Sequence, residues 1–117
     1  MDFHAEFEKS IQAFPNIEGL IFADPDGEFI LFEAPTMEDF DVKLAGAKMP
    51  IMLQAYRFAG INRQPQVLEI FFGNRYVITI CLVEQYTITA VARNLREKGR
   101  LRRYLLKMAA KFNQEIV

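Results

Sequence analysis

Hydrophobic residues in the second half of the chain are arranged as three successive strands. The runs cover residues 67–72, 76–83 and 86–93, and they are separated by Gly73-Asn74 and Glu84-Gln85. A pair that begins with Gly suits a two-residue hairpin turn, so the pattern predicts an antiparallel meander. The middle run is almost entirely apolar, and a strand that is apolar on both faces must be covered on both sides. We therefore expect the meander to be the middle layer of the domain.

The N-terminal part of the chain predicts a helix followed by a separate hairpin. Apolar residues recur at helical spacing in residues 2–14, and Asp2 is a suitable N-cap. Strands are expected at 17–23 and 29–32. Residues 24–27 read Asp-Pro-Asp-Gly, which is a strong turn signal because Pro presets one dihedral and Gly supplies a positive φ.

Residues 36–61 predict one long helix with two apolar stripes. The first stripe consists of Phe40, Leu44, Ala47, Ile51, Ala55 and Phe58, and the second of Val42, Met49, Leu53 and Tyr56. One stripe is sufficient to dock the helix on the sheet, so we expect the second to face another chain. Deep burial within the same chain is the alternative. Pro50 in the middle of the helix predicts a kink.

A last helix follows the meander, with Asn94 as its expected N-cap and Glu97 in the reciprocal position. Its apolar stripe contains Leu101, Leu105, Met108, Ala109, Phe112 and Ile116. Short links inside both hairpins make a five-stranded antiparallel sheet the simplest arrangement. The prediction is a single α+β domain over residues 1–117, with the first and last helices on one face and the long helix on the other.

The strand at 67–72 opens the meander and is therefore expected at an edge of the sheet. Edges are normally protected by charge, Pro or a bulge, and here Glu69 is the one charged residue among apolar ones. Pairing with the same strand of a second copy would cover this edge. Strand and helix stripe together predict a homodimer interface of Val42, Met49, Leu53, Tyr56, Val67, Glu69, Ile70 and Phe71.

Composition favours a folded cytoplasmic protein. Of the 117 residues, 51% are hydrophobic and 25% are charged, which excludes a disordered chain. No apolar run approaches the roughly 20 residues of a membrane span, and the acidic N-terminus is unlike a signal peptide. The single Cys permits no internal disulfide, which fits a reducing compartment.

Candidate chemistry is sparse, and we predict no catalytic residue, cofactor or metal. His4 has no neighbouring nucleophile and is interpreted as an ordinary residue of the first helical turn. Cys81 lies in the most apolar run and is expected to pack in the core. Asp24, Asp26 and Glu28 lack the later ligands of a calcium-binding loop, so turn formation explains them. The protein is not expected to be an enzyme.

Two strings resemble the roadblock / dynein light-chain family. Residues 17–22 running into 24–28 match a strand and an Asp-Gly turn of that family. Residues 41–48 leading into 51–53 resemble the long-helix signature of bacterial members that regulate a Ras-like GTPase of cell polarity and motility. The chain departs from those members at Pro50.

The resemblance implies a roadblock (profilin-like) fold and a homodimer in which the long helix and strand 67–72 pair with their symmetry mates. It also implies that the dimer binds a Ras-like small GTPase and acts on its nucleotide cycle as an activating or localising scaffold, without binding nucleotide itself. Lys43, Lys48 and Arg57 are the candidate contacts for the GTPase.

Two other functions remain open. A small-ligand sensor of profilin-like fold would need a pocket between sheet and helix, and the 11 Phe residues argue against a void. A binder of nucleic acid or membrane would use residues 93–117, which hold eight basic residues against Glu97 and Glu115. Residues 1–41 hold eleven acidic residues against Lys9, so compensation within the fold is the simpler explanation and neither partner is expected. A steep salt dependence of binding would identify such a ligand.

Overall fold

The structure, a computed structural model, describes residues 1–38, 41, 45–49, 51–52 and 67–116. Five strands form one antiparallel sheet, as predicted, and their order in the sheet is β2-β1-β5-β4-β3. The strands are β1 (Ile17–Ala23), β2 (Phe29–Glu33), β3 (Val67–Phe72), β4 (Arg75–Cys81) and β5 (Thr87–Arg93). The other elements are the helices α1 (Phe3–Ala13) and α3 (Lys98–Ile116) and the 3-10 turns η1 (Val83–Gln85) and η2 (Leu95–Glu97). Among the described residues, no helix is both long and apolar enough to cross a membrane.

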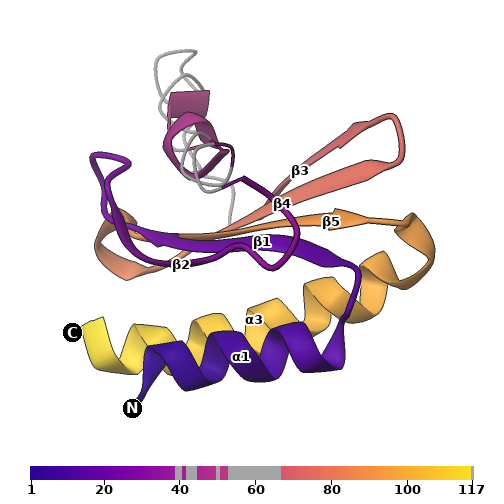
Figure 1. Cartoon of the computed structure of the whole chain (residues 1–117). Helices are drawn as coiled ribbons and strands as arrows, with labels where there is room; N and C mark the ends of the chain where they lie inside the picture. Colours follow the sequence, from indigo (N-terminus) through magenta and orange to yellow (C-terminus); the bar gives the residue numbers. More distant parts are fainter. Residues whose placement is uncertain (39–40, 42–44, 50, 53–66, 117) are drawn as a thin grey trace.

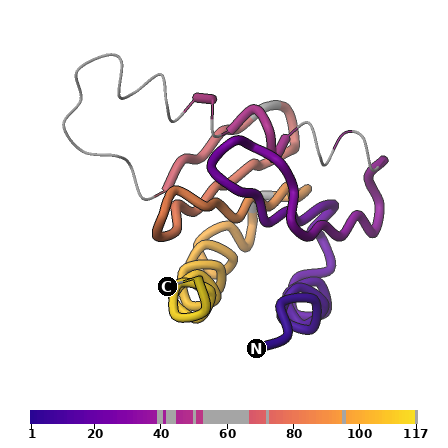
Figure 2. The backbone as a smooth tube through the Cα atoms, turned by 90° about the vertical axis from the view of Figure 1, so that its left-hand side faces the viewer, coloured from indigo at the N-terminus to yellow at the C-terminus, as the bar shows by residue number. Residues whose placement is uncertain are grey.

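Helices α1 and α3 lie side by side on one face of the sheet (Figures 1 and 2). Asp2 caps α1 as expected, because its carboxylate accepts a hydrogen bond from the Ala5 N–H at 3.1 Å. The core under these helices contains an aromatic cluster in which the Phe112 ring lies 4.5 Å from that of Phe3 and 5.1 Å from that of Phe22, centroid to centroid. Such ring contacts add to the hydrophobic stabilisation of this face.

The opposite face is covered by residues of the expected long helix (Figure 1). Asp41, residues 45–49 and residues 51–52 are helical. Gly46 approaches β1 so closely that an added Cβ would lie 2.5 Å from Cδ1 of Ile21. The absence of a side chain at this position therefore lets the helix lie close to the sheet. The remainder of the predicted helix, including Pro50 and its expected kink, lies outside the described residues.

The second link of the meander and the predicted N-cap of the last helix differ in detail from expectation. Glu84 and Gln85 both have left-handed backbone, with φ of 55° and 65°, and they form a 3-10 turn in place of a two-residue hairpin turn. Asn94 does not cap α3. Its φ is 66° and its side chain accepts the N–H of Arg96 at 3.1 Å, so it begins η2 and α3 starts later, at Lys98. An N-cap needs extended backbone, which the left-handed Asn94 does not have.

Candidate functional site

The outer edge of β3 is the main candidate site. β3 pairs with β4 from Val67↔Ile80 to Phe72↔Arg75 without a register shift, and it lies at one end of the sheet as predicted. The hairpin closes through Gly73, with φ of 61°, and Asn74. The residues beside a two-residue turn form a hydrogen-bonded pair, and such pairs alternate along antiparallel strands. The N–H groups of Glu69 and Phe71 therefore point to the open edge, and that of Ile70 points to β4.

Side chains of β3 alternate between the two faces of the sheet. On the α3 face, Glu69 accepts a hydrogen bond from Arg102 at 2.8 Å. Phe71 stacks on Tyr76 with centroids 5.1 Å apart and remains 47% exposed. On the other face, Leu68 and Ile70 pack around Met49. The four predicted interface residues of β3 are thus divided, because Val67, Glu69 and Phe71 face α3 and Ile70 faces the other helix.

Tyr76 lies directly behind this edge with its hydroxyl buried. The hydroxyl has no hydrogen bond of normal geometry among the described residues. Burial, followed by the neighbouring Glu69 carboxylate, raises the pKa of Tyr76 well above its usual value, and Arg102 opposes this only in part. The phenol is therefore neutral at physiological pH. An uncharged aromatic side chain thus packs directly behind the β3 edge.

The structure reverses the two helix stripes where it describes them. Met49, expected to face a second chain, is 3% exposed and packs on Val77 and Val91 of its own sheet. Ile51, expected to face the sheet, is 64% exposed. Both sides of the helix are apolar, so hydrophobicity could not distinguish them. Gly46 was the available signal, because Met49 lies three residues further along and on the same side of a helix.

Of the remaining predicted contact residues, only Lys48 lies among the described residues. Lys48 is an exposed helical residue. The other predicted helix residues of the interface and of the GTPase contact lie outside the described residues, namely Val42, Lys43, Leu53, Tyr56 and Arg57. Their assignments stay predictions.

A buried charge that the sequence interpretation missed lies at the end of the sheet next to the β3–β4 turn. Glu18 is 2% exposed, and its two carboxylate oxygens face the Nε atoms of Arg93 and Arg75, the second at 3.4 Å. Arg75 and Arg93 are cross-strand partners, so without Glu18 two like charges would oppose each other. An acidic residue inside an otherwise apolar strand was the signal for this cluster.

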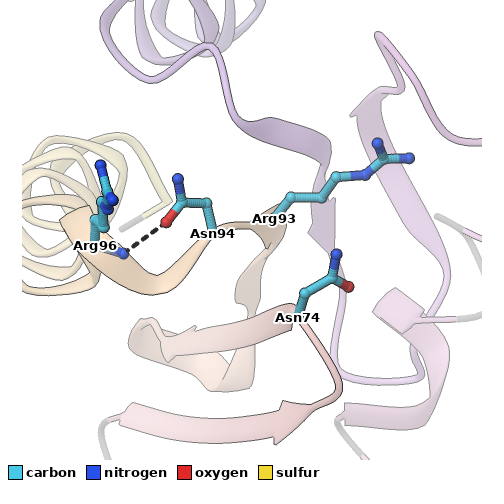
Figure 3. Close-up of a pocket in the computed structure, with 4 residues that line it drawn as sticks. All are labelled: Asn74, Arg93, Asn94 and Arg96. Atoms are coloured by element: carbon cyan, nitrogen blue, oxygen red, sulfur yellow. Dashed lines mark hydrogen bonds between the residues drawn. The ribbon is translucent and has the colours of Figure 1, made fainter.

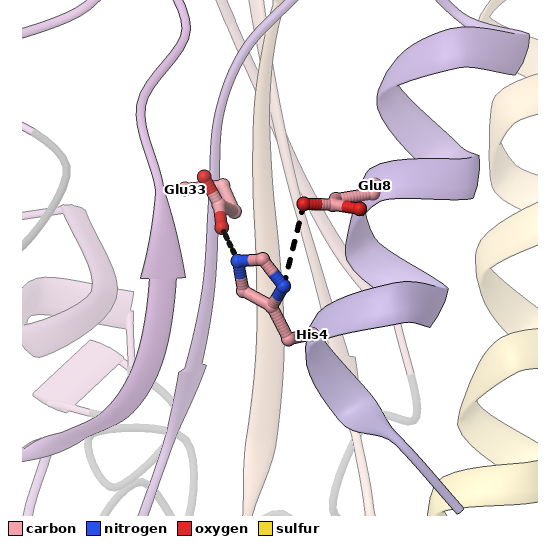
Figure 4. Close-up of side chains that lie close together, drawn as sticks. All are labelled: His4, Glu8 and Glu33. Carbon is pink, nitrogen blue, oxygen red and sulfur yellow. Dashed lines mark ion pairs between the residues drawn. The ribbon is translucent and has the colours of Figure 1, made fainter.

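His4 lies between two carboxylates from different elements (Figure 4). Its Nδ1 is 3.4 Å from Glu8 on α1, and its Nε2 contacts Glu33 at the end of β2. The ligand-type atoms of the three side chains lie within 4.8 Å of one another. The two carboxylates lie at opposite nitrogens of one ring, so the His4 side chain links α1 to β2.

Other sequence candidates occupy ordinary structural positions. Asp24 accepts hydrogen bonds from the N–H groups of Asp26 and Glu28, which confirms turn formation. Cys81 is the last residue of β4 and is half-buried, so the expectation of core burial is wrong at this strand end. The basic face of α3 is partly compensated from α1, where Glu6 lies 3.7 Å from the Lys111 Nζ.

Solved structures share this architecture. A Roadblock/LC7 domain from Streptomyces avermitilis matches with a TM-score of 0.85 at 10% identity, over 99% of this chain and 98% of that one. MglB of Myxococcus xanthus matches with a TM-score of 0.78 at 11% identity, over 99% and 98%. An MglB described with a tetrameric arrangement matches with a TM-score of 0.81 at 8% identity, over 95% and 85%.

The chain therefore has the roadblock/LC7 fold, which confirms the fold that the sequence resemblance implied. No protein-family model and no curated protein sequence matches the chain.

Proposed function

We propose that the protein is a dimeric regulatory scaffold that binds a Ras-like small GTPase and modulates its nucleotide cycle. The dimer forms by antiparallel pairing of β3 with β3 of a second copy, and the GTPase docks on the assembled dimer. The protein has no catalytic centre of its own and works in the cytoplasm by positioning groups of the GTPase.

The observation that carries this proposal is the open edge of β3. The outward N–H groups of Glu69 and Phe71 have no paired strand among the described residues, and the strand has no bulge. A straight, largely apolar edge of this kind favours pairing with another strand. An identical strand related by a two-fold axis satisfies both edges at once. The tetrameric arrangement described for one MglB is in keeping with self-association of this fold.

The GTPase partner is supported by a different observation. The string at 41–48 resembles bacterial roadblock proteins that regulate a Ras-like GTPase, and MglB proteins are among the structures that share the fold. Lys43, Lys48 and Arg57 remain the proposed contacts, and Lys48 is exposed where the structure describes it. Val42, Leu53 and Tyr56 remain proposed dimer contacts of the helix.

Replacing Glu69 by Pro tests the dimer, because it deletes an N–H group that points to the open edge and leaves the bonds to β4 in place. Light scattering after size exclusion should give the dimer mass for the natural protein and the monomer mass for Glu69→Pro. Glu69→Thr is the matched control, since it removes the carboxylate but keeps the amide, and it should remain dimeric. A dimeric Glu69→Pro protein with native circular dichroism would refute pairing through β3.

Recovery of the partner tests the rest of the proposal. The tagged protein, expressed in its native host, should copurify with a small GTPase, and nucleotide analysis should find GDP or GTP in the eluate. The purified GTPase should then hydrolyse or release its nucleotide at a changed rate when the dimer is added. A GTPase that binds the monomeric Glu69→Pro protein at full strength would refute docking on two subunits.

A further inference from the structure

The open edge of β3 allows few ways for a second copy of the chain to pair with it. In an antiparallel pair, residues whose N–H groups point to the partner strand lie directly opposite each other. On β3 the outward N–H groups belong to Val67, Glu69 and Phe71, because outward and inward groups alternate from the turn. If most of the six residues are to pair, the two-fold axis must place Glu69 opposite Glu69 of the second copy, or Ile70 opposite Ile70 of the second copy.

The end of β3 is held in place, so its edge is a fixed template. The Asn94 N–H donates to the Asn74 carbonyl at 3.1 Å, which ties the β3–β4 turn to the end of β5. The Asn16 side chain donates to the carbonyls of Arg93 and Asn94 at 2.7 and 3.2 Å. Figure 3 shows Asn74 in this turn, with Arg93 and Asn94 at the end of β5. A second copy would therefore meet an ordered edge and would lose less free energy in ordering it.

The backbone and the side chains both favour the axis at Glu69. That register opposes all the outward residues and gives three hydrogen-bonded pairs, whereas the register at Ile70 gives two. Val67 would lie opposite Phe71 of the second copy on the α3 face. Leu68 would lie opposite Ile70 of the second copy on the other face, so apolar residues oppose apolar residues throughout. The register at Ile70 would instead place Glu69 opposite Phe71 of the second copy.

Two carboxylates meet at the axis in this register, and α3 supplies the compensating charges. Directly opposed like charges alone would destabilise a strand pair. Glu69, however, already accepts a hydrogen bond from Arg102 of its own copy at 2.8 Å. The axis would therefore carry two carboxylates and two guanidinium groups, with no net charge. Each guanidinium has five N–H donors, so it can bind the Glu69 carboxylates of both copies.

Helix α3 runs along β3 in the opposite direction. The Lys98 Nζ lies 5.0 Å from the centroid of the Phe71 ring. Arg102, four residues later, contacts Glu69, which lies two residues earlier in β3. Four helical residues advance about 6 Å and two strand residues about 6.7 Å. Each turn of this helix therefore lies beside one α3-facing residue of the strand.

Two exposed apolar side chains fit the same register. The next step along both elements places Leu106 beside Val67, because Leu106 lies on the same side of α3 as Arg102. Leu106 is 39% exposed, and Phe71 near the other end of the strand is 47% exposed. Pairing at Glu69 brings Phe71 of the second copy opposite Val67. The two exposed side chains then cover each other at both ends of the paired strands.

We propose that the two-fold axis of the dimer passes between the two Glu69 residues. Arg102 of each copy compensates the opposed carboxylates, and Leu106 of one copy packs on Phe71 of the other. The inference rests on the proposed dimer, and it identifies the residues by which one copy of this chain recognises a second.

Disulfide cross-linking tests the register in a Cys81→Ser background, where the introduced thiol is the only one. Glu69→Cys sets two thiols opposite each other with Cα atoms about 5.5 Å apart, within the range of a disulfide. Ile70→Cys sets them on diagonal positions about 8 Å apart, which is too far. In a glutathione buffer Glu69→Cys should therefore form a covalent dimer, and Ile70→Cys should not.

Light scattering after size exclusion separates failure of the register from failure of the dimer. Cross-linking of Ile70→Cys in place of Glu69→Cys, in a protein of dimer mass, would overturn the register alone. A dimer in which neither variant cross-links would also overturn it. A monomer mass for the natural protein would overturn the dimer and the register together.

Charge reversal tests the ion pairs at the axis. Arg102→Glu places four carboxylates around it and should raise the dissociation constant of the dimer at least about tenfold. Adding Glu69→Arg restores two charges of each sign and should return the constant to within about threefold of the natural value. Arg103→Glu is the matched control, because Arg103 lies on the other side of α3 beside Phe14 and Tyr104, and it should leave the constant unchanged. Equal weakening by Arg102→Glu and Arg103→Glu would overturn the proposal.

Discussion

The two edges of the sheet are built differently. β2 is short, and its pairing with β1 shifts register near Phe22 and Ala23, so that Ile30 is left without a partner residue. A bulge of this kind twists an edge away from further pairing. β3 at the other end keeps a regular register with β4 along its whole length and has no such device.

The side chains that hold the two edges also differ. Glu33 at the end of β2 is tied to α1 through His4, a contact at the rim of the sheet. β3 is backed on one face by Tyr76 and on the other by Met49, both of which are buried. An exposed, apolar edge is therefore not by itself an interface. A straight edge whose two faces are both packed against buried side chains is the better candidate, and this is why we propose that the dimer forms through β3.

The largest effect is expected from Ile70→Pro. Its N–H points to β4, so Pro removes a bond inside the sheet and should lower the free energy of unfolding by about 3 kcal/mol or more, a large part of the roughly 5–15 kcal/mol of a typical domain. Urea unfolding followed by circular dichroism measures this. Ile30→Pro, placed in the bulge of β2, is the control and should fold with unchanged mass. An Ile70→Pro protein with undiminished stability would show that the outward and inward positions of β3 are assigned in reverse.

Met49→Ala tests the backing of β3. Truncation leaves a cavity against Val77 and Val91 and should lower the free energy of unfolding by about 2–4 kcal/mol. Ile51→Ala removes an exposed side chain and should change the stability of a monomeric background by less than about 0.5 kcal/mol. Denaturant titration of both variants in the Glu69→Pro background excludes effects of dimer formation. Equal losses would contradict the assignment of Met49 to the sheet side.

Tyr76→Phe examines the same backing at alkaline pH. Because the folded pKa of Tyr76 is raised, the unfolded chain releases the phenol proton at about pH 10 while the folded chain keeps it. The contribution of Tyr76 is therefore intact below about pH 10 and is lost as the pH rises further. The Phe variant should lose less stability than the natural protein between about pH 9 and 11. Identical pH profiles would mean that the hydroxyl is not buried behind β3.

The smallest effects are expected from the ion pairs at the two edges. Arg102→Gln at β3 and His4→Gln at β2 each remove a partly exposed pair and should cost less than about 1 kcal/mol. Thermal unfolding at low and high salt measures both, and added salt should reduce the differences. A loss of several kcal/mol in either variant would indicate that the ion pair, and not the packing behind the strand, maintains that edge.

Much of the architecture followed from local pattern. Alternation and turn residues located all five strands, and the predicted end of the sheet for β3 is confirmed. These features are local because side-chain period and turn chemistry depend on neighbours in the chain. The Asp2 cap and the Asp24 turn were likewise readable, since each satisfies backbone groups within four residues.

Contacts between distant segments were beyond such patterns. Which apolar side of the 36–61 segment meets the sheet depends on the close approach of Gly46 to Ile21, residues far apart in the chain. The role of Glu18 depends on the pairing of β1, β5 and β4, which brings Arg75 and Arg93 next to its carboxylate. Periodicity describes how one element is built, whereas burial and charge pairing depend on which elements meet. The amphipathic pattern therefore determined the elements and their order along the chain, and tertiary packing decided which residues became core, edge support and buried ion pair.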